Sequence, residues 1–368
     1  MTSLWSRVGL ALSLAGLTTV GAAAIKSQHS KPAPKTATHP VAPKRKAVAA
    51  IPAPAFIRDR IDSLGKAFDG RVGIAVRSID DGWETGWKDD ELYPQQSVSK
   101  LWVSITALDA VDRGRVSLDD KVTLGRSDLT VFHQPLRDLV LANGSFTTTL
   151  GDLMVRAITT SDNTANDRLM RAVGGPSAVR RMIAAKHLGA IRFGNGERAL
   201  QSKIAGLAWS QDYAIGNAFF EARDALPIAT RRAAFNAYIA SPYDGAAPSA
   251  IAGALARLKQ GKLLSPASTA RLLDIMANTH TGPNRLRGGL QPGWTISHKT
   301  GTGQELDGIQ AGYNDIGILV GPNGRRYAIA VMIKKTSTPL PVRMTMMNDV
   351  VEAVIQQDGM ARKADKAR

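Results

Sequence analysis

Apolar residues alternate as in β-strands near both ends of this chain, and a long stretch with helical spacing separates the two regions. The region near the start has the alternating residues Val72, Ile74 and Val76, followed by a turn and a second strand. The region near the end has three predicted strands, at residues 294–299, 309–319 and 327–333. Since the middle, about residues 118–290, is mostly helical, we expect the two ends to form one sheet and the helices to be inserted between them.

This pattern predicts an α/β fold: an antiparallel five-stranded sheet flanked by helices, with an inserted all-helical lobe and a cleft between the two parts. Flanking helices are predicted at residues 56–68 and 341–357. The 368 residues, 44% of them hydrophobic, supply enough apolar mass for a sizeable core. We therefore assign one folded domain to residues 56–358 and a basic tail to residues 359–368.

The first 55 residues have the composition of a targeting segment followed by a linker. Residues 1–24 combine a basic start with a run of apolar and small residues, which is typical of a secretory signal peptide. The alternative is an uncleaved membrane anchor, for which the run is short and weakly hydrophobic. Residues 25–55 are rich in Pro, Ala and Lys and predict an extended linker. We expect an exported, periplasmic protein, tethered to the membrane if the first segment is retained.

The net charge of +16 is unevenly distributed. Seven of the basic residues lie within residues 1–55, which contain no acidic residue. We therefore expect no nucleic-acid partner, and we expect an electrostatic association of the basic tether with the anionic cell envelope, with a merely solvated linker as the alternative. The folded domain is expected to be a monomer.

Several kinds of active site are missing from the sequence. The chain has no cysteine, which excludes disulfides and thiol nucleophiles. None of the six histidines has the spacing of zinc ligands, and no H-E-x-x-H motif occurs. Neither a G-x-S-x-G motif nor a phosphate-binding loop is present. We expect no metal and no organic cofactor.

A serine and a lysine three residues apart, Ser97 and Lys100, begin a predicted helix. The free N–H groups and the dipole of a helix start favour developing negative charge, and an amine one turn on can reach the hydroxyl. A serine needs such a base, because a free hydroxyl is a poor nucleophile at neutral pH. The S-x-x-K pattern is weak alone, and we interpret a second copy, Ser63 to Lys66, as surface.

Two further short motifs follow in the chain. Ser161-Asp162-Asn163 comes after an apolar helix, and Lys299-Thr300-Gly301 comes at the end of a predicted strand. A helix N-cap and a solvated strand end are the alternative interpretations. Each three-residue string has about a one-in-ten chance of occurring in a chain of this length, so the full set in this order is improbable by coincidence.

Together these motifs resemble those of the class A serine β-lactamases and, more broadly, of the penicillin-recognising serine enzymes. The resemblance extends from about Phe56 to Gln357 and includes a segment from Glu197 to Gln201 that is similar to the E-x-x-L-N motif of the omega loop. It implies hydrolysis of the β-lactam ring through a Ser97 acyl-enzyme, which is released by water that Glu197 activates. The acylation base, Lys100 or Glu197, is left open.

The resemblance also implies roles for residues that surround the nucleophile. Ser161 would pass a proton to the leaving nitrogen, and the backbone N–H groups of Ser97 and Thr302 would form an oxyanion hole. The remaining residues implied to bind a small-molecule β-lactam substrate are Asn163, Gln201, Arg285, Lys299, Thr300 and Gly301. A surface position is the alternative for Arg285, and either Phe132 or His133 is expected at the mouth of the cleft.

Some features depart from the family pattern. Gln201 replaces an Asn, Asn166-Asp167 replaces Ala-Asn, and Asn195 replaces an Arg expected to pair with Asp244. Residues 202–243, called the insertion below, are about thirty residues longer than expected and rich in aromatic residues, so we expect a helical subdomain that narrows substrate choice. Two other functions fit the motifs, a D,D-peptidase-like enzyme that releases its acyl group slowly and a non-hydrolytic envelope-binding protein.

Overall fold

The computed structural model describes residues 51–366. The predicted signal segment and nearly all of the predicted linker, residues 1–50, lie outside the described residues. Within the described part, no helix is long and apolar enough to cross a membrane.

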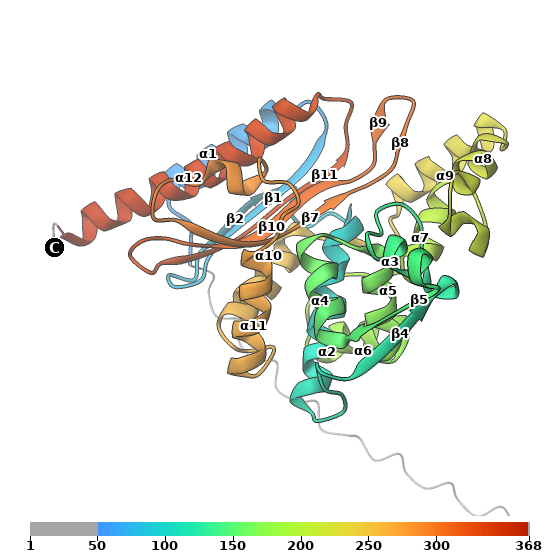
Figure 1. Ribbon diagram of the computed structural model, residues 1–368. Helices are drawn as coiled ribbons and strands as arrows, with labels where there is room; N and C mark the ends of the chain where they lie inside the picture. Colours follow the sequence, from blue (N-terminus) through green and yellow to red (C-terminus); the bar gives the residue numbers. More distant parts are fainter. Residues whose placement is uncertain (1–50, 367–368) are drawn as a thin grey trace, which may run out of the picture. The chain divides into compact units, whose positions relative to one another are not determined.

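A five-stranded antiparallel sheet joins the two ends of the chain, as the sequence predicts (Figure 1). Its strands lie in the order β2-β1-β11-β10-β7. β1 pairs with β11 so that Ile74 lies opposite Val331. The strands span β1 (Arg71–Ser78), β2 (Glu84–Trp87), β7 (Thr295–Thr302), β10 (Tyr313–Val320) and β11 (Arg326–Lys335). β7 is an edge strand, and so half of its backbone groups face away from the sheet.

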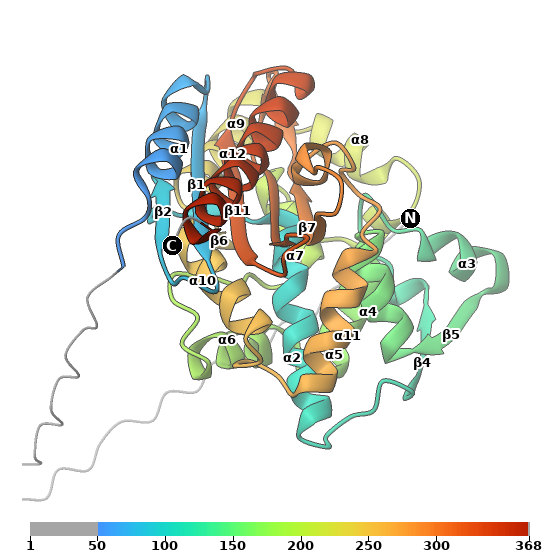
Figure 2. The same ribbon diagram turned by 90° about the vertical axis from the view of Figure 1, so that its left-hand side faces the viewer.

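Each face of the sheet is covered by helices, because side chains alternate between the faces. On one face lie α1 (Ala55–Ala67) and α12 (Leu340–Lys366), which run side by side (Figure 2). On the other face lies α10 (Pro248–Lys259), which packs on β1, β10 and β11. α12 extends beyond the predicted end at residue 357, where Arg362 pairs with Asp358 at 3.1 Å and Arg325 pairs with Asp365 at 2.7 Å. These ion pairs continue the helix after its apolar part ends.

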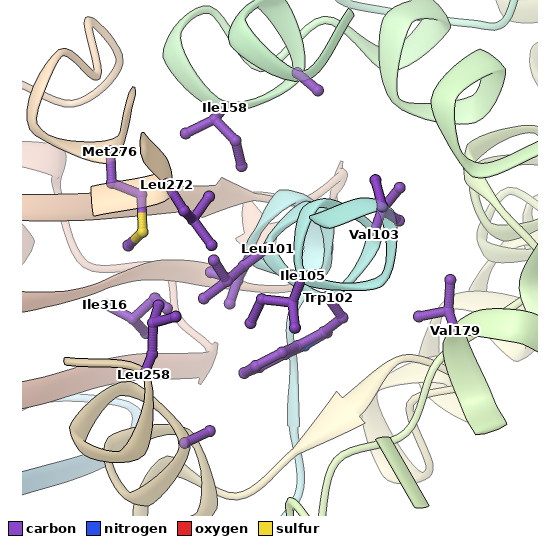
Figure 3. Packing of buried hydrophobic residues seen from close by; sticks show 14 of the residues in the cluster. Leu101, Trp102, Val103, Ile105, Ile158, Val179, Leu258, Leu272, Met276 and Ile316 are labelled. Atoms are coloured by element: carbon purple, nitrogen blue, oxygen red, sulfur yellow. The ribbon is translucent and has the colours of Figure 1, made fainter. Parts of the chain in front are cut away.

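The inserted lobe is built around α2 (Lys100–Asp112). The sequence predicts one apolar face for this helix, but every residue from Lys100 to Leu108 is buried, because helices surround it. Figure 3 shows Leu101, Trp102 and Ile105 packing toward the sheet and the neighbouring helices. Its neighbours include α4 (Leu150–Thr159), α5 (Asn163–Ala172), α6 (Gly175–Ala185) and α11 (Pro266–Ala277).

Several short elements are missing from the sequence prediction. The middle of the chain contains helix α3 (Leu136–Asn143) and, on either side of it in the sequence, β4 (Lys121–Gly125) and β5 (Ser145–Thr149), which pair as a two-stranded antiparallel sheet. The predicted strand 309–319 is divided, because Gly312, with φ of 91°, breaks it. Its first part, β9 (Ile309–Gln310), pairs with β8 (Glu305–Leu306), and β3 (Tyr93–Pro94) pairs with β6 (Gly245–Ala246).

The insertion contains two helices, α8 (Ala218–Asp224) and α9 (Ile228–Ala240), after α7 (Glu197–Ile204). Apolar contacts fix both helices to the rest of the lobe. Phe219 of α8 packs with Val131 and Ala205, whereas α9 packs on α7 and the β8–β9 hairpin through Phe235 and its neighbours.

Candidate active site

Ser97 and Lys100 lie at the junction of the two lobes. Ser97 is part of a 3-10 helix, η1 (Gln96–Ser99), and Lys100 is the first residue of α2. Lys100 Nζ, fully buried, lies 2.6 Å from Ser97 Oγ. It also donates to Asn163 Oδ1 at 2.7 Å and to Glu197 Oε1 at 2.6 Å. The other S-x-x-K copy is exposed on α1, where Lys66 pairs with Asp62, as the surface interpretation expects.

Glu197 begins α7 and is 4% exposed. One oxygen, Oε1, accepts from Lys100, and the other, Oε2, accepts from Gln201 Nε2 at 3.1 Å. Its backbone N–H donates to Asp167 Oδ1 at 3.1 Å. The preceding Gly196 has φ of 93°, a conformation that favours glycine. This turn directs the carboxylate inward, and a single lysine then separates it from the Ser97 hydroxyl.

The Ser161-Asp162-Asn163 motif combines a helix cap with two side chains that face the site. Asp162 is the N-cap of α5: its carboxylate accepts from Ala165 N at 2.8 Å and Leu136 N at 2.7 Å. Ser161 has φ of 62°, and left-handed backbone at a non-glycine residue costs on the order of 1–3 kcal/mol. Asn163 donates to Val131 O at 2.8 Å, which fixes its carbonyl oxygen toward Lys100. The N-cap interpretation is therefore correct for Asp162.

Lys299 lies on edge strand β7 and is fully buried. Its Nζ donates to Ser161 Oγ and to Thr300 O, both at 3.0 Å. Burial, with the nearby charge of Lys100, lowers the pKa of Lys299 well below its usual value. Gly301 is required by packing, because a Cβ there would clash with the carbonyl oxygen of Gln95 beside the nucleophile. The missing side chain lets β7 approach the Ser97 turn.

Arg285 is 8% exposed, so the surface interpretation is wrong. Its guanidinium donates to the carbonyls of Gly301 at 3.1 Å and Asn314 at 2.7 Å, and to Thr302 Oγ1 at 2.6 Å. It also stacks 3.8 Å from the centre of the Tyr313 ring. These contacts hold the guanidinium beside the exposed edge of β7.

A pocket of about 510 Å³ lies where these segments meet. The sequence-predicted residues on its surface are Ser97, Ser161, Asn163, Gln201, Arg285, Thr300 and Thr302. Lys100, Glu197 and Lys299 contact these residues from behind. Both residues expected at the cleft mouth, Phe132 and His133, line the pocket. Further lining residues were not predicted: Phe220, Arg223, Thr281, Gly303, Gln304 and Glu305.

Gln96, next to the nucleophile, is buried and forms hydrogen bonds with several segments around the site. The sequence analysis did not predict this role. It has φ of 53°, and its side chain accepts from Gln201 at 3.0 Å and donates to Tyr238 Oη at 2.6 Å. Its backbone N–H donates to Asp244 Oδ2 at 2.6 Å. The position of Gln96 directly before the serine of the S-x-x-K motif is visible in the sequence. A single sequence does not show which residues a glutamine contacts in the fold.

Two carboxyls near Glu197 are buried without an ion pair. Asp244 accepts from Gln96 N and from Tyr238 Oη at 2.9 Å, whereas Asn195 accepts instead from Arg180 at 3.1 Å. Hydrogen bonds thus take the place of the arginine pair that the family pattern suggests. Burial raises the pKa of Asp244 to about 6. Burial and the charge of Glu197 raise the pKa of Asp167 to about 6 as well.

Comparison with known proteins identifies the family of the chain. The model of the beta-lactamase enzyme family matches residues 56–357. The chain is 25% identical to beta-lactamase VEB-1 of Pseudomonas aeruginosa over 294 residues, 80% of this chain and 87% of that protein. It is 27% identical to the extended-spectrum beta-lactamase PER-1 of the same organism over 303 residues, 82% of this chain and 87% of that protein.

The fold is similar to that of solved beta-lactamases. The crystal structure of a beta-lactamase from Chitinophaga pinensis superposes with a TM-score of 0.68 at 27% identity, covering 82% of this chain and 99% of the other. The chain therefore belongs to the beta-lactamase enzyme family. Within it, the relatives and the serine-based motifs define a class A serine β-lactamase, a hydrolase.

Proposed function

We propose that this enzyme opens the β-lactam ring through an acyl-enzyme on Ser97, which water activated by Glu197 then releases. The observation that carries the proposal is the position of Lys100 Nζ, 2.6 Å from both Ser97 Oγ and Glu197 Oε1. Nucleophile, cation and carboxylate are thus joined in one buried chain, as nucleophilic catalysis requires.

In acylation, Ser97 Oγ attacks the ring carbonyl carbon and loses its proton to a base. Lys100 takes it directly, after its own proton passes to Glu197, or Glu197 takes it through a water molecule. The geometry supports either route. Negative charge on the carbonyl oxygen is stabilised by the N–H groups of Ser97 and Thr302, since β7 is an edge strand whose outward groups face the nucleophile turn.

When the ring C–N bond breaks, the Ser161 hydroxyl passes its proton to the leaving nitrogen. Ser161 Oγ then takes up the proton that the base removed from Ser97, which leaves Glu197 unprotonated for deacylation. Lys299 donates to Ser161 Oγ, so the Ser161 hydrogen is free to point into the pocket. The ring carboxylate is bound by Lys299, Thr300 and Arg285 through charge-assisted hydrogen bonds. Asn163 binds the amide of the acyl side chain.

In deacylation, Glu197 removes a proton from the water that attacks the ester carbonyl, and Ser97 leaves with that proton returned to it. Gln201 donates to Glu197 Oε2 and so fixes the carboxylate plane. Gln304 in turn donates to Gln201 Oε1 at 3.0 Å, which links this support to the segment after β7.

The test is the Glu197→Gln variant mixed with a chromogenic cephalosporin. We expect the acyl-enzyme to form and then accumulate, with kcat reduced about a thousandfold and an adduct on Ser97 seen by mass spectrometry. Glu352→Gln, an exposed residue of α12, is the matched control and keeps full turnover. Fast turnover by Glu197→Gln would contradict the role of Glu197. A stoichiometric burst by the wild-type enzyme would favour the D,D-peptidase-like alternative.

We also propose that the protein is exported to the periplasm, where residues 25–55 act as a basic tether to the envelope and the folded domain works as a monomer. The basic start and small-residue run of residues 1–24 support export, and the acid-free composition of residues 1–55 supports the tether.

A further inference from the structure

One wall of the pocket comes from the insertion. Phe220 and Arg223, both on α8, line the same pocket as Ser97. Phe220 is 41% exposed, a high value for an ordered aromatic side chain. No catalytic step described above uses either residue, and so their position calls for a separate explanation.

The position of α8 is fixed on both sides of the pocket mouth. Phe219, which precedes Phe220 on α8, is 1% exposed and meets Phe132 edge to face at 4.9 Å. The ring of Phe220 lies 6.0 Å from Phe132. α9 lies beside the β8–β9 hairpin (Figure 1), where Arg232 pairs with Asp307 at 2.6 Å. The insertion is therefore a supported wall with one exposed side chain, Phe220, and one half-buried side chain, Arg223, facing the pocket.

Arg223 retains positive charge beside this aromatic surface. Its Nε and Nη2 donate to Asp224 at 2.9 and 3.3 Å, and the same carboxylate pairs with Arg231 at 3.1 Å. Two guanidiniums thus share one carboxylate, which leaves a net charge of +1 in the group. Arg223 lies 5.1 Å from the centre of the Phe220 ring, and its Nη1 has no hydrogen-bond partner among the described residues.

This wall belongs to the end of the pocket that takes the acyl side chain. Asn163 is hydrogen-bonded to Val131 O, and the next residue, Phe132, contacts Phe220. Lys299, Thr300 and Arg285 form the other end. Because Asn163 binds the side-chain amide in the proposed function, groups beyond that amide extend toward α8. Glu305, on β8, makes the sheet side unfavourable for a second carboxylate.

We propose that Phe220 and Arg223 select β-lactams whose acyl side chain carries an aromatic ring and a carboxylate. The ring packs on Phe220 and Phe132, and the carboxylate accepts a hydrogen bond from Arg223 Nη1. The inference rests on the proposed function, since the substrate must first be oriented by Asn163.

The test compares benzylpenicillin with carbenicillin, its analogue with a carboxylate beside the phenyl ring. In Arg223→Gln, we expect kcat/KM for carbenicillin to fall about tenfold, the effect of one charge-assisted hydrogen bond, and that for benzylpenicillin to stay within about twofold. Arg181→Gln, with the same loss of charge at an exposed position of α6, should leave the ratio of the two values unchanged. Raising the salt concentration should reduce the wild-type preference for carbenicillin.

A second variant tests the aromatic part. Phe220→Ala should raise KM for both aryl penicillins and leave 6-aminopenicillanic acid, which has no acyl side chain, unaffected. Melting temperatures check that each variant folds. An unchanged ratio in Arg223→Gln, or an equal fall in Arg181→Gln, overturns the inference while hydrolysis persists. Wild-type enzyme that hydrolyses neither penicillin contradicts the proposed function instead.

Discussion

The site has two sides with opposite electrostatic character, and two lysines show the difference. Lys100, on the helical side, and Lys299, on the sheet side, are both fully buried. Lys100 is paired with Glu197, and a second carboxyl, Asp167, contacts the Glu197 backbone. Lys299 and Arg285 donate hydrogen bonds only to neutral oxygens and form no ion pair with a described carboxylate. The helical side therefore holds its lysine in a buried ion pair, whereas Lys299 and Arg285 on the sheet side have no paired carboxylate among the described residues.

In the proposed function, this separation orients the substrate before any bond breaks. A β-lactam carries its carboxylate on the ring, so attraction to Lys299 and Arg285 places that end on the sheet side. The ring carbonyl then lies near Ser97, and the bases stay on the opposite side. Burial strengthens both effects, because charges interact more strongly where water is excluded.

The largest expected effect on the difference between the two sides comes from removing the cation of the helical side. Lys100→Met should lower the rate of acylation about a thousandfold, since Ser97 loses its contact with a base and Glu197 loses its counter-ion. Stopped-flow measurement with a chromogenic cephalosporin gives this rate. Lys66→Met, in the exposed S-x-x-K copy, is the control. Acylation at the wild-type rate would remove Lys100 from the mechanism.

The buried carboxyl of Asp167 on the helical side should also make the stability of the fold depend on pH. Folding raises the pKa of Asp167 from 3.8 to about 6, so the folded protein holds this proton more tightly than the unfolded chain does. The resulting stabilisation is complete below pH 3.8 and is lost as pH rises through about 6. Asp167→Asn should therefore unfold at higher denaturant concentration at pH 7, with a gain of up to about 3 kcal/mol that disappears toward pH 4.

Denaturant unfolding across this pH range measures the effect. Asp59→Asn, at an exposed site on α1, should follow the wild-type profile. If the stability of Asp167→Asn and that of the wild type change in parallel with pH, folding does not raise the pKa of the Asp167 carboxyl.

The smallest effect concerns the sheet side at high pH. Because the pKa of Lys299 is lowered, its charge and the binding of the substrate carboxylate are lost at a pH below the usual lysine value of 10.5. In Lys299→Arg the guanidinium stays protonated, so the alkaline fall of kcat/KM should move to higher pH. The pH profile of kcat/KM checks this, and an unshifted alkaline limb would assign the fall to another group.

Much of the fold is readable from the chain, because period-two alternation marks β1 and β11, and turn residues mark the start of β2 and the end of β10. The residue pattern does not show that α2 runs through the centre of the lobe, since its environment comes from segments distant in sequence. β8 and β9, of two residues each, are too short for a periodic signal. The far end of α12 was missed because ion pairs rather than apolar residues continue it.

The candidate site likewise has residues that could be predicted from the sequence and residues that could not. The motifs identified the residues around Ser97 because each is a short, ordered string. Gln96, Asp167 and Asp244 support those residues from behind, and their importance depends on contacts across the fold. Phe220 and Arg223 were within the recognised insertion, but only the packing of Phe219 shows which side of α8 faces the pocket.

The pairing of β1 with β11 has a consequence for how the chain folds. β11 is the middle strand, and its first residue, Arg326, follows β1 by most of the length of the domain. Contacts between such distant segments form slowly, because a long loop must close first. A chain delivered from its N-terminus cannot complete its sheet until the last part emerges. Until then, β1 and β10 lack the strand that joins them, and the sheet stays incomplete.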